Sequence, residues 1–327
     1  MAGLEVAVTG PTGEIGISTV QALERDPAVD RIVGMARRPF DPAAHGWTKT
    51  TYQQGDILDR KAVDALVADV DVVIDLAFVI MGSREESARV NLAGTRNVFE
   101  ATVTAQRPRR LVYTSSVAAY GYHSDNPVPI TEDVPPRGSP EHYYSEQKAA
   151  CEAELAKITK GSSLEVFILR PCIVAGPNAP ALADAMPWRH LPGVLQSATQ
   201  ALPLLKMPIP DPGFPLQLVH HDDVAAAIAL AATTDAPPGA YNIAGDGELS
   251  ISEVVTALGG HPVRVPAVSA TAALTVIAHM PFVPSALEWL HVARASVVMD
   301  TSKAKSQLGW KPKYTSAETL RTLAEAI

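Results

Sequence analysis

The chain has 327 residues, of which 47% are hydrophobic and 19% are charged, so it can bury one large core or two smaller ones. Its net charge of -8 argues against a nucleic-acid backbone as a partner. Its two cysteines exclude a disulfide framework, and because no leader segment precedes the first predicted strand, we expect a cytoplasmic protein.

Residues Leu4 to Thr9 are mostly apolar, which is typical of a strand buried on both faces. A glycine-rich turn follows and opens a helix that runs to about Arg25. Three glycines in this position allow a tight turn, close approach of the backbone to a pyrophosphate, and close packing of helix on strand. The turn therefore predicts dinucleotide binding by Gly10, Thr12, Gly13, Glu14, Ile15 and Gly16.

The second predicted strand, Arg31 to Ala36, is followed directly by Arg37 and Arg38. An acidic residue at this distance from the glycines would bind the ribose hydroxyls of NAD. Two arginines instead suit a ribose 2′-phosphate. The expected cofactor is therefore NADP, with NAD as the alternative if the two arginines only form a solvated loop.

Further strands are predicted at 50–54, 71–78, 109–114 and 164–169, with helices between them, including one from Arg84 to Gln106. Strands that alternate with helices at this spacing predict an α/β fold with a doubly wound parallel sheet, a Rossmann arrangement. Ligands of such sheets lie at the carboxyl ends of the strands. Ser116 follows one of these ends, on the same rim as the glycine turn.

A helix predicted from Glu141 to about Lys160 carries Tyr144 and Lys148, which are four residues apart and share one face. An ammonium about 4 Å from the phenol is worth roughly 4 kcal/mol and would lower the pKa of the phenol by about 3. A serine hydroxyl nearby could hydrogen-bond a substrate oxygen while the tyrosine exchanges its proton. The predicted catalytic residues are Ser116, Tyr144 and Lys148, and the alternative is an ordinary surface helix.

The chain changes character after Pro171, because residues 171–217 hold ten of the 27 prolines and only four charged side chains. This segment predicts a lid or pocket wall rather than a regular helix. A strand from Leu216 to His220 then leads into a helix that opens with His221, Asp222 and Asp223. These side chains could be metal ligands, but capping of the helix is the better explanation, so no metal is expected.

A strand at 241–244, a helix from Ser250 to Leu258 and another that ends at 308–310 complete the predicted elements. We expect a dinucleotide-binding domain of residues 1–175, to which 216–247 return, and a smaller substrate-binding region of residues 176–215 and 248–314. The uncharged run from Val265 to Leu287 is interrupted by three prolines, so no stable membrane insertion is expected.

Taken jointly and in order, these motifs resemble the extended short-chain dehydrogenase/reductase family, of the NAD-dependent epimerase/dehydratase type. The resemblance covers nearly the whole chain. It rests on residues 9–16, 55–56, 75–77, Asn91 with 94–95, 115–116 with 120–121, Tyr144 with Lys148, 169–171 with 176–177, 219–220 with 223–225, and 308–310.

The resemblance implies that Ser116 and Tyr144 are catalytic and that Lys148 also holds the nicotinamide ribose. It places Asp56 and Ile57 around the adenine. It adds Leu76, Ala77, Asn91, Thr114, Pro171 and Ile173 to the expected cofactor contacts, together with Tyr144 and Lys148. It also implies a homodimer formed through the helices that contain Asn91 and Tyr144.

The function expected is hydride transfer between NAD(P) and a carbonyl or alcohol carbon of a small-molecule substrate. The alternatives are a nucleotide-sugar epimerase or dehydratase, and a non-catalytic NAD(P)-binding sensor. Family members that act on nucleotide sugars usually carry Asn and Arg where this chain has Ile173 and Leu216. A diphosphate without charged partners is unfavourable, so a largely apolar substrate is predicted.

Overall fold

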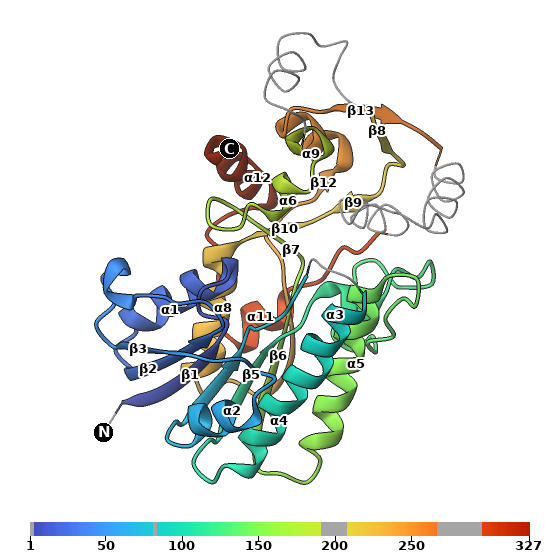
Figure 1. Cartoon of the computed structure of the whole chain (residues 1–327). Coiled ribbons are helices and arrows are strands. Elements are labelled where there is room, and N and C mark those ends of the chain that lie inside the picture. The colour runs from blue at the N-terminus through green and yellow to red at the C-terminus, as the bar shows by residue number, and fades with distance from the viewer. Residues whose placement is uncertain (1–2, 81–83, 191–207, 267–295) are drawn as a thin grey trace.

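The computed structural model describes residues 3–80, 84–190, 208–266 and 296–327, and its centre is a seven-stranded parallel sheet (Figure 1). The strand order is β3-β2-β1-β4-β5-β6-β11, so the chain winds outward from β1 in both directions. The predicted doubly wound sheet is therefore confirmed. The strands are β1 (Leu4–Thr9), β2 (Val29–Ala36), β3 (Thr50–Gln54), β4 (Val72–Asp75), β5 (Arg110–Thr114), β6 (Glu165–Pro171) and β11 (Gly239–Ile243).

Successive side chains of each strand point to opposite sides of the sheet. Both faces are buried, because helices cover each of them. Val6 and Val8 of β1 join the core on one side, and Ala7 between them joins the core on the other. The first side is covered by α1 (Glu14–Arg25), α8 (His221–Thr233) and α11 (Ser302–Gln307). The second is covered by α2 (Arg60–Val67), α4 (Thr95–Thr104) and α5 (Tyr143–Ile158). Figure 1 shows the two helical layers.

The elements predicted at 71–78 and 84–106 differ clearly in extent from the observed ones. The strand expected from Asp71 to Phe78 ends at Asp75, because the backbone N–H groups of Leu76 and Ala77 donate to Thr9 Oγ1 instead of to a neighbouring strand. The helix expected from Arg84 to Gln106 consists of α3 (Arg84–Ala88), a π-helical segment η2 (Arg89–Gly94) and α4. The π-helical segment contains Asn91, and such segments often occur at functional sites.

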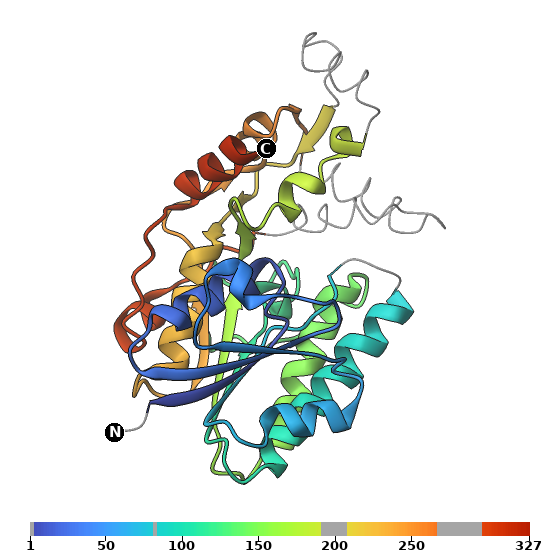
Figure 2. The ribbon, with the colours of Figure 1, turned by 60° about the vertical axis from the view of Figure 1, so that its left-hand side comes forward.

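A smaller region stands above the carboxyl edge of the sheet (Figure 2). Its three strand pairs are β7 (Ile173–Ala175) with β10 (Leu218–His220), β9 (Pro215–Leu216) with β12 (Leu249–Ser250), and β8 (Pro208–Asp211) with β13 (His261–Arg264). Its helices are α6 (Ala181–Asp184), α9 (Ile251–Ala257) and α12 (Ser316–Ala326). These elements share an apolar core of their own.

The strand predicted from Leu216 to His220 is divided between β9 and β10. Gln217 separates them, because its side-chain amide pairs with the backbone of Met299, accepting from the N–H at 2.8 Å. Three short 3-10 segments complete the described elements: η1 (Pro42–His45), η3 (Val117–Tyr120) and η4 (Pro187–His190).

His220 caps α8, which begins at His221. The imidazole of His220 accepts the backbone N–H of Asp222 at 3.2 Å and stacks on Tyr314 at 3.9 Å between ring centroids. Burial lowers the pKa of His220 to about 4, so the ring stays neutral and can accept. His221 contacts Ser18 of α1 through Nδ1 at 2.8 Å. The contact between His221 and Ser18 therefore attaches α8 to α1.

Most of the uncharged run from Val265 to Leu287, and residues 191–207 of the predicted lid, lie outside the described residues. Among the helices that the structure describes, none is long and apolar enough to cross a bilayer.

Candidate functional site

The glycine turn between β1 and α1 has the geometry of an anion cradle. Gly10 has a φ of 68°, and a Cβ on Gly16 would lie 2.1 Å from the carbonyl oxygen of Gly10, so both positions require glycine. Within the described part of the chain, a Cβ on Gly13 would have only one neighbour within 4 Å, at 3.5 Å, so its outer side is open there. Gly13 is the N-cap of α1 and supplies no side-chain cap. The N-terminal N–H groups of α1 are thus available to an anion.

Thr9 joins this turn to the end of β4. Its hydroxyl donates to the buried carboxylate of Asp75 at 2.6 Å and accepts the N–H groups of Leu76 and Ala77 at 3.2 Å each. Burial raises the pKa of Asp75 to about 6. The second carboxylate oxygen of Asp75 and the hydroxyl of Thr114, at the ends of adjacent strands, are buried with no partner in the described part of the chain. Buried polar atoms without partners at this rim fit a polar ligand.

The predicted adenosine contacts follow β2 and β3 on the same edge. Arg37 and Arg38 are exposed, and within the described residues neither side chain forms an ion pair. Asp56 accepts the backbone N–H of Leu58 at 3.0 Å, while Ile57 is buried against Gly94. This edge therefore presents two unpaired guanidinium groups beside the glycine turn.

The two serines after β5 point in different directions. Ser115 donates to the carboxylate of Glu152 at 2.5 Å, inside the core. Ser116 caps η3 by accepting the N–H of Ala118 at 3.1 Å, and its hydroxyl is close enough to Tyr144 to lower the pKa of that phenol. Of the two, Ser116 is therefore the one that faces the tyrosine.

Lys148 follows Tyr144 by one turn of α5, and its side chain is buried. Its Nζ donates to the carbonyl oxygen of Thr114 at 2.8 Å and is 5.9 Å from the centre of the Tyr144 ring. Burial raises the pKa of Tyr144, and the Ser116 hydroxyl lowers it by less. The expected fall in the pKa of Tyr144 is thus wrong, because burial of the phenol has the larger effect. Burial also lowers the pKa of Lys148 to about 8.

Phe78 is a part of the site that the sequence reasoning missed. Its ring lies 3.6 Å from Lys148 Nζ and meets the Tyr144 ring edge-on at 5.6 Å. An aromatic face near a buried ammonium provides a favourable cation–π contact. The sequence feature that could have identified Phe78 is its position just after the buried strand β4, because side chains there lie at the carboxyl edge of the sheet.

Asn91 supports the site indirectly. Its amide accepts the N–H of Val79 at 2.8 Å and donates to the carbonyl of Val79 at 2.9 Å and to Gln147 at 2.8 Å. Through these hydrogen bonds the Asn91 amide connects the loop after β4 to α5. Ser145 also attaches α5 to η3, because its hydroxyl donates to the carbonyl of Ala118 at 2.6 Å.

Behind the site, a buried ion pair connects α5 with β6. Arg170 donates to Glu152 through two nitrogens, at 3.0 and 2.6 Å, and both side chains are buried. Arg170 also donates to the hydroxyl of Tyr120 at 2.8 Å, which in turn contacts Asn242 of β11 at 2.7 Å. This network fixes α5 relative to the sheet.

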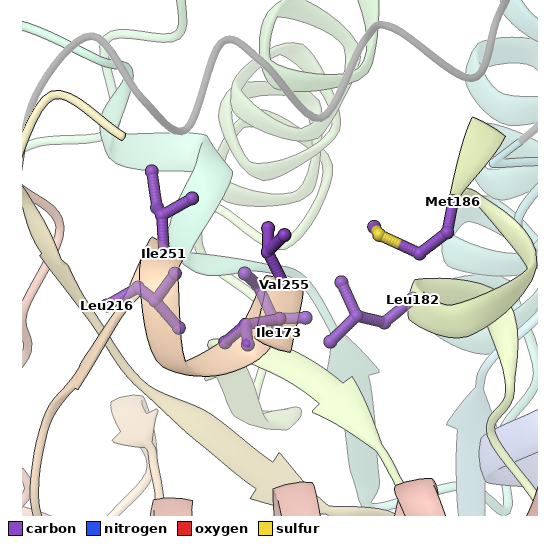
Figure 3. Close-up of a pocket in the computed structure, with 7 residues that line it drawn as sticks. Ile173, Leu182, Met186, Leu216, Ile251 and Val255 are labelled. Atoms are coloured by element: carbon purple, nitrogen blue, oxygen red, sulfur yellow. The ribbon is translucent and has the colours of Figure 1, made fainter. Parts of the chain in front are cut away.

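Beyond β6 the chain opens onto an apolar hollow in the smaller region (Figure 3). The hollow is small, with a volume of about 30 Å³. Pro171 ends β6, and Ile173 points into the hollow two residues later, so one of the predicted cofactor contacts also lines it. The lining consists of apolar side chains from β7, α6 and the turn after it, β9 and α9: Ile173, Leu182, Met186, Leu216, Ile251, Val254 and Val255.

The chain matches known proteins along most of its length. A model of the NAD dependent epimerase/dehydratase family matches residues 6–244. An uncharacterized protein of Mycobacterium tuberculosis is 25% identical over 96% of this chain and 81% of its own. The low-salt glycan biosynthesis protein Agl12 of Haloferax volcanii is 25% identical over 98% of both chains.

Solved structures show the same fold. UDP-glucuronic acid 4-epimerase from Bacillus cereus, determined with NAD, superposes with a TM-score of 0.72 at 20% identity, over 99% of this chain and 98% of its own. UDP-glucose 4-epimerase from Thermotoga maritima gives a TM-score of 0.71 at 20% identity, with 99% and 98% covered.

Proposed function

Because the chain belongs to the NAD dependent epimerase/dehydratase family, we propose that it is an NADP(H)-dependent oxidoreductase that moves a hydride to or from a carbonyl or alcohol carbon. The observation that carries this proposal is the convergence of three side chains at the sheet rim: Ser116 after β5, Tyr144 at the start of α5 and the buried Lys148 one turn later. A sensor that had lost catalysis would not need to keep all three side chains.

The protonation states favour reduction of a carbonyl. Because burial raises the pKa of Tyr144, the phenol keeps its proton at neutral pH and can donate it to a carbonyl oxygen. Ser116 can hydrogen-bond the same oxygen. Lys148, with a pKa near 8, remains mostly protonated and stabilises the phenolate left by proton transfer. A bound NADPH would supply the hydride.

The cofactor would be held by the sheet rim. The glycine turn and the N-terminus of α1 suit its pyrophosphate, and Arg37 and Arg38 suit a 2′-phosphate. Thr114 offers a buried hydroxyl without a partner among the described residues. Similar solved structures contain NAD, so the preference for NADP rests on the two arginines of this chain.

The substrate we propose is largely apolar. The hollow beside Ile173 is lined by seven apolar side chains, and each Å² of apolar surface buried there contributes about 25 cal/mol. The same lining offers nothing to a diphosphate, whose burial without partners is strongly unfavourable. Nearby, Arg189 pairs with Asp184 at 3.5 Å and Arg264 with Asp211 at 3.8 Å. The proposed substrate is a steroid, terpenoid, polyketide or aromatic ketone, of which this small hollow would receive only a part.

Epimerisation or dehydration of a nucleotide sugar is the second candidate, because the similar solved structures include enzymes of those names. In that reaction the hydride returns to the same substrate, so the cofactor is regenerated within one turnover.

A substrate screen distinguishes the two. Purified protein is mixed with NADPH and hydrophobic ketones, or with UDP- and dTDP-sugars, and both NADPH absorbance and sugar products are followed. Consumption of NADPH with a ketone, absent in Tyr144→Phe, supports the oxidoreductase. Conversion of sugars beside inert ketones contradicts the apolar substrate.

We also propose a homodimer through the surface of η2, α4 and α5. In support, Leu92 of this surface is 39% exposed, and a shallow hollow runs between the helices. Light scattering at micromolar concentration should give twice the mass of one chain, and a monomer contradicts the proposal.

A further inference from the structure

The segment that carries Arg37 and Arg38 is hydrogen-bonded to the end of β3. β2 and β3 pair in parallel as far as Ala36 and Gln54. Beyond that point the backbone is still engaged, because Gly55 donates its N–H to the carbonyl of Ala36 at 3.0 Å. Gln54 donates its side-chain amide to the carbonyl of Arg37 at 2.8 Å.

Tyr52 makes the central contact of this segment. Its hydroxyl donates to the carbonyl of Ala36 at 2.7 Å and to the carbonyl of Arg38. One phenolic proton is thus shared between the carbonyls before and after Arg37. Tyr52 and Gln54 alternate with Gln53 along β3, so their side chains leave the strand on the same face.

The chain beyond the arginines returns to the same tyrosine. The ring of Phe40 lies 5.6 Å from the ring of Tyr52, and it also contacts His45 at 4.9 Å and the buried Trp47 at 5.4 Å. The residues on both sides of the short segment 37–39 therefore contact the side chain of Tyr52. The two guanidinium groups are left to face solvent.

We propose that Tyr52 is a positioning residue for cofactor choice, which holds the backbone of Arg37 and Arg38 so that their guanidinium groups converge on a ribose 2′-phosphate. The inference rests on the proposed preference for NADP and adds the residue that enforces it. Preorganised donors bind more tightly because less chain entropy is lost on binding. NAD lacks the 2′-phosphate, so its affinity should not depend on this contact.

The test compares dissociation constants for NADP and NAD in Tyr52→Phe. Loss of one hydrogen bond that orders the segment should weaken NADP binding by about three- to tenfold and change NAD binding by less than about twofold. Tyr241→Phe is the matched control, since its hydroxyl also donates to a backbone carbonyl, that of Pro237, at the opposite edge of the sheet. It should alter neither constant.

A double-mutant cycle separates positioning from a general structural effect. In a background of Arg37→Ala and Arg38→Ala, Tyr52→Phe should change NADP binding by less than about twofold. If Tyr52→Phe proves unstable by thermal melting, the exposed Gln54→Met removes the donor to the Arg37 carbonyl and should weaken NADP selectively.

Equal weakening of both cofactors, or an unchanged ratio, overturns the role of Tyr52 while leaving the function proposed above intact. Tighter binding of NAD by the wild type, unaffected by loss of the arginines, overturns the NADP assignment and this inference together.

Discussion

Lys148 Nζ lies 3.6 Å from the centre of the Phe78 ring, and the same ammonium donates to the carbonyl of Thr114. The charged group is buried, with an aromatic face and a carbonyl replacing part of its hydration. Because burial favours the neutral amine, the pKa of Lys148 falls to about 8.

This lowered pKa predicts a pH-dependent stability. In the unfolded chain the lysine titrates near its ordinary value of 10.5, so between pH 8 and 10.5 the unfolded state holds more protons than the native state. The destabilising contribution of Lys148 is therefore complete below pH 8 and disappears as the pH rises to 10.5. The free energy of unfolding of wild type, relative to Lys148→Met, should increase by about 2 kcal/mol between pH 7 and 10.

Denaturant melts of both proteins at each pH measure this difference, and comparison with the variant cancels the titration of the tyrosines. A pH-independent difference would show that Lys148 is not desolvated as described.

Tyr144→Phe should reduce turnover by about 10²- to 10⁴-fold, because it removes the proton donor and little volume. Cofactor affinity should stay within about twofold. Tyr143→Phe is the matched control, since that neighbouring phenol donates to the carbonyl of Ile80 and is not expected to contact the substrate. Steady-state rates and cofactor titrations decide the matter; turnover by Tyr144→Phe within about threefold of wild type would remove the tyrosine from the mechanism.

Two glycines of the same turn should respond differently to alanine. A Cβ on Gly16 would meet the Gly10 carbonyl at 2.1 Å, so Gly16→Ala should destabilise the fold by about 2 kcal/mol or more. A Cβ on Gly13 meets the protein only at 3.5 Å, so Gly13→Ala should melt within a few degrees of wild type. The new methyl would, however, stand in the pyrophosphate's place and weaken cofactor binding at least about tenfold. Thermal melts and titrations measure both; normal cofactor affinity in a folded Gly13→Ala would place the pyrophosphate elsewhere.

The hollow can be tested with a polar isostere. Met186→Gln keeps the length of the side chain but places an amide among aliphatic groups, at a cost of about 1–3 kcal/mol when an apolar ligand covers it. KM for an apolar ketone should rise about tenfold or more with kcat little changed. Val263→Gln, on the exposed strand β13, should leave both constants unchanged. Equal KM values for wild type and Met186→Gln would exclude Met186 from the substrate site.

The parallel, doubly wound arrangement was predictable because the sequence signals of its strands and helices are local. Runs of buried apolar residues ended by glycine or serine marked β1 and β5, and β1 and β3 have the predicted bounds. The short extent of β4 was not predictable. It depends on Thr9, 66 residues away from Asp75, which takes over the N–H groups that a longer strand would have used.

The site itself was predictable as a set of positions but not as an arrangement. Spacing along one helix indicated that Tyr144 and Lys148 share a face, but the partners of Lys148 come from β5 and from the loop after β4. Similarly, Ser115 and Ser116 look equivalent in the sequence, and only the position of Glu152 on α5 shows which of them turns inward. Long-range polar partners decided each of these points.

The buried pair of Glu152 and Arg170 has a consequence for amide hydrogen exchange. Through Tyr120 and Asn242 it links α5 to β6 and β11, and separating these ions without their partners is strongly unfavourable. The inner amides of α5 should therefore exchange only through near-global opening, whereas those around the exposed Arg37 should exchange by local fluctuation. The proton-transfer machinery and the cofactor-selecting segment thus belong to parts of the native state that open at very different free energies.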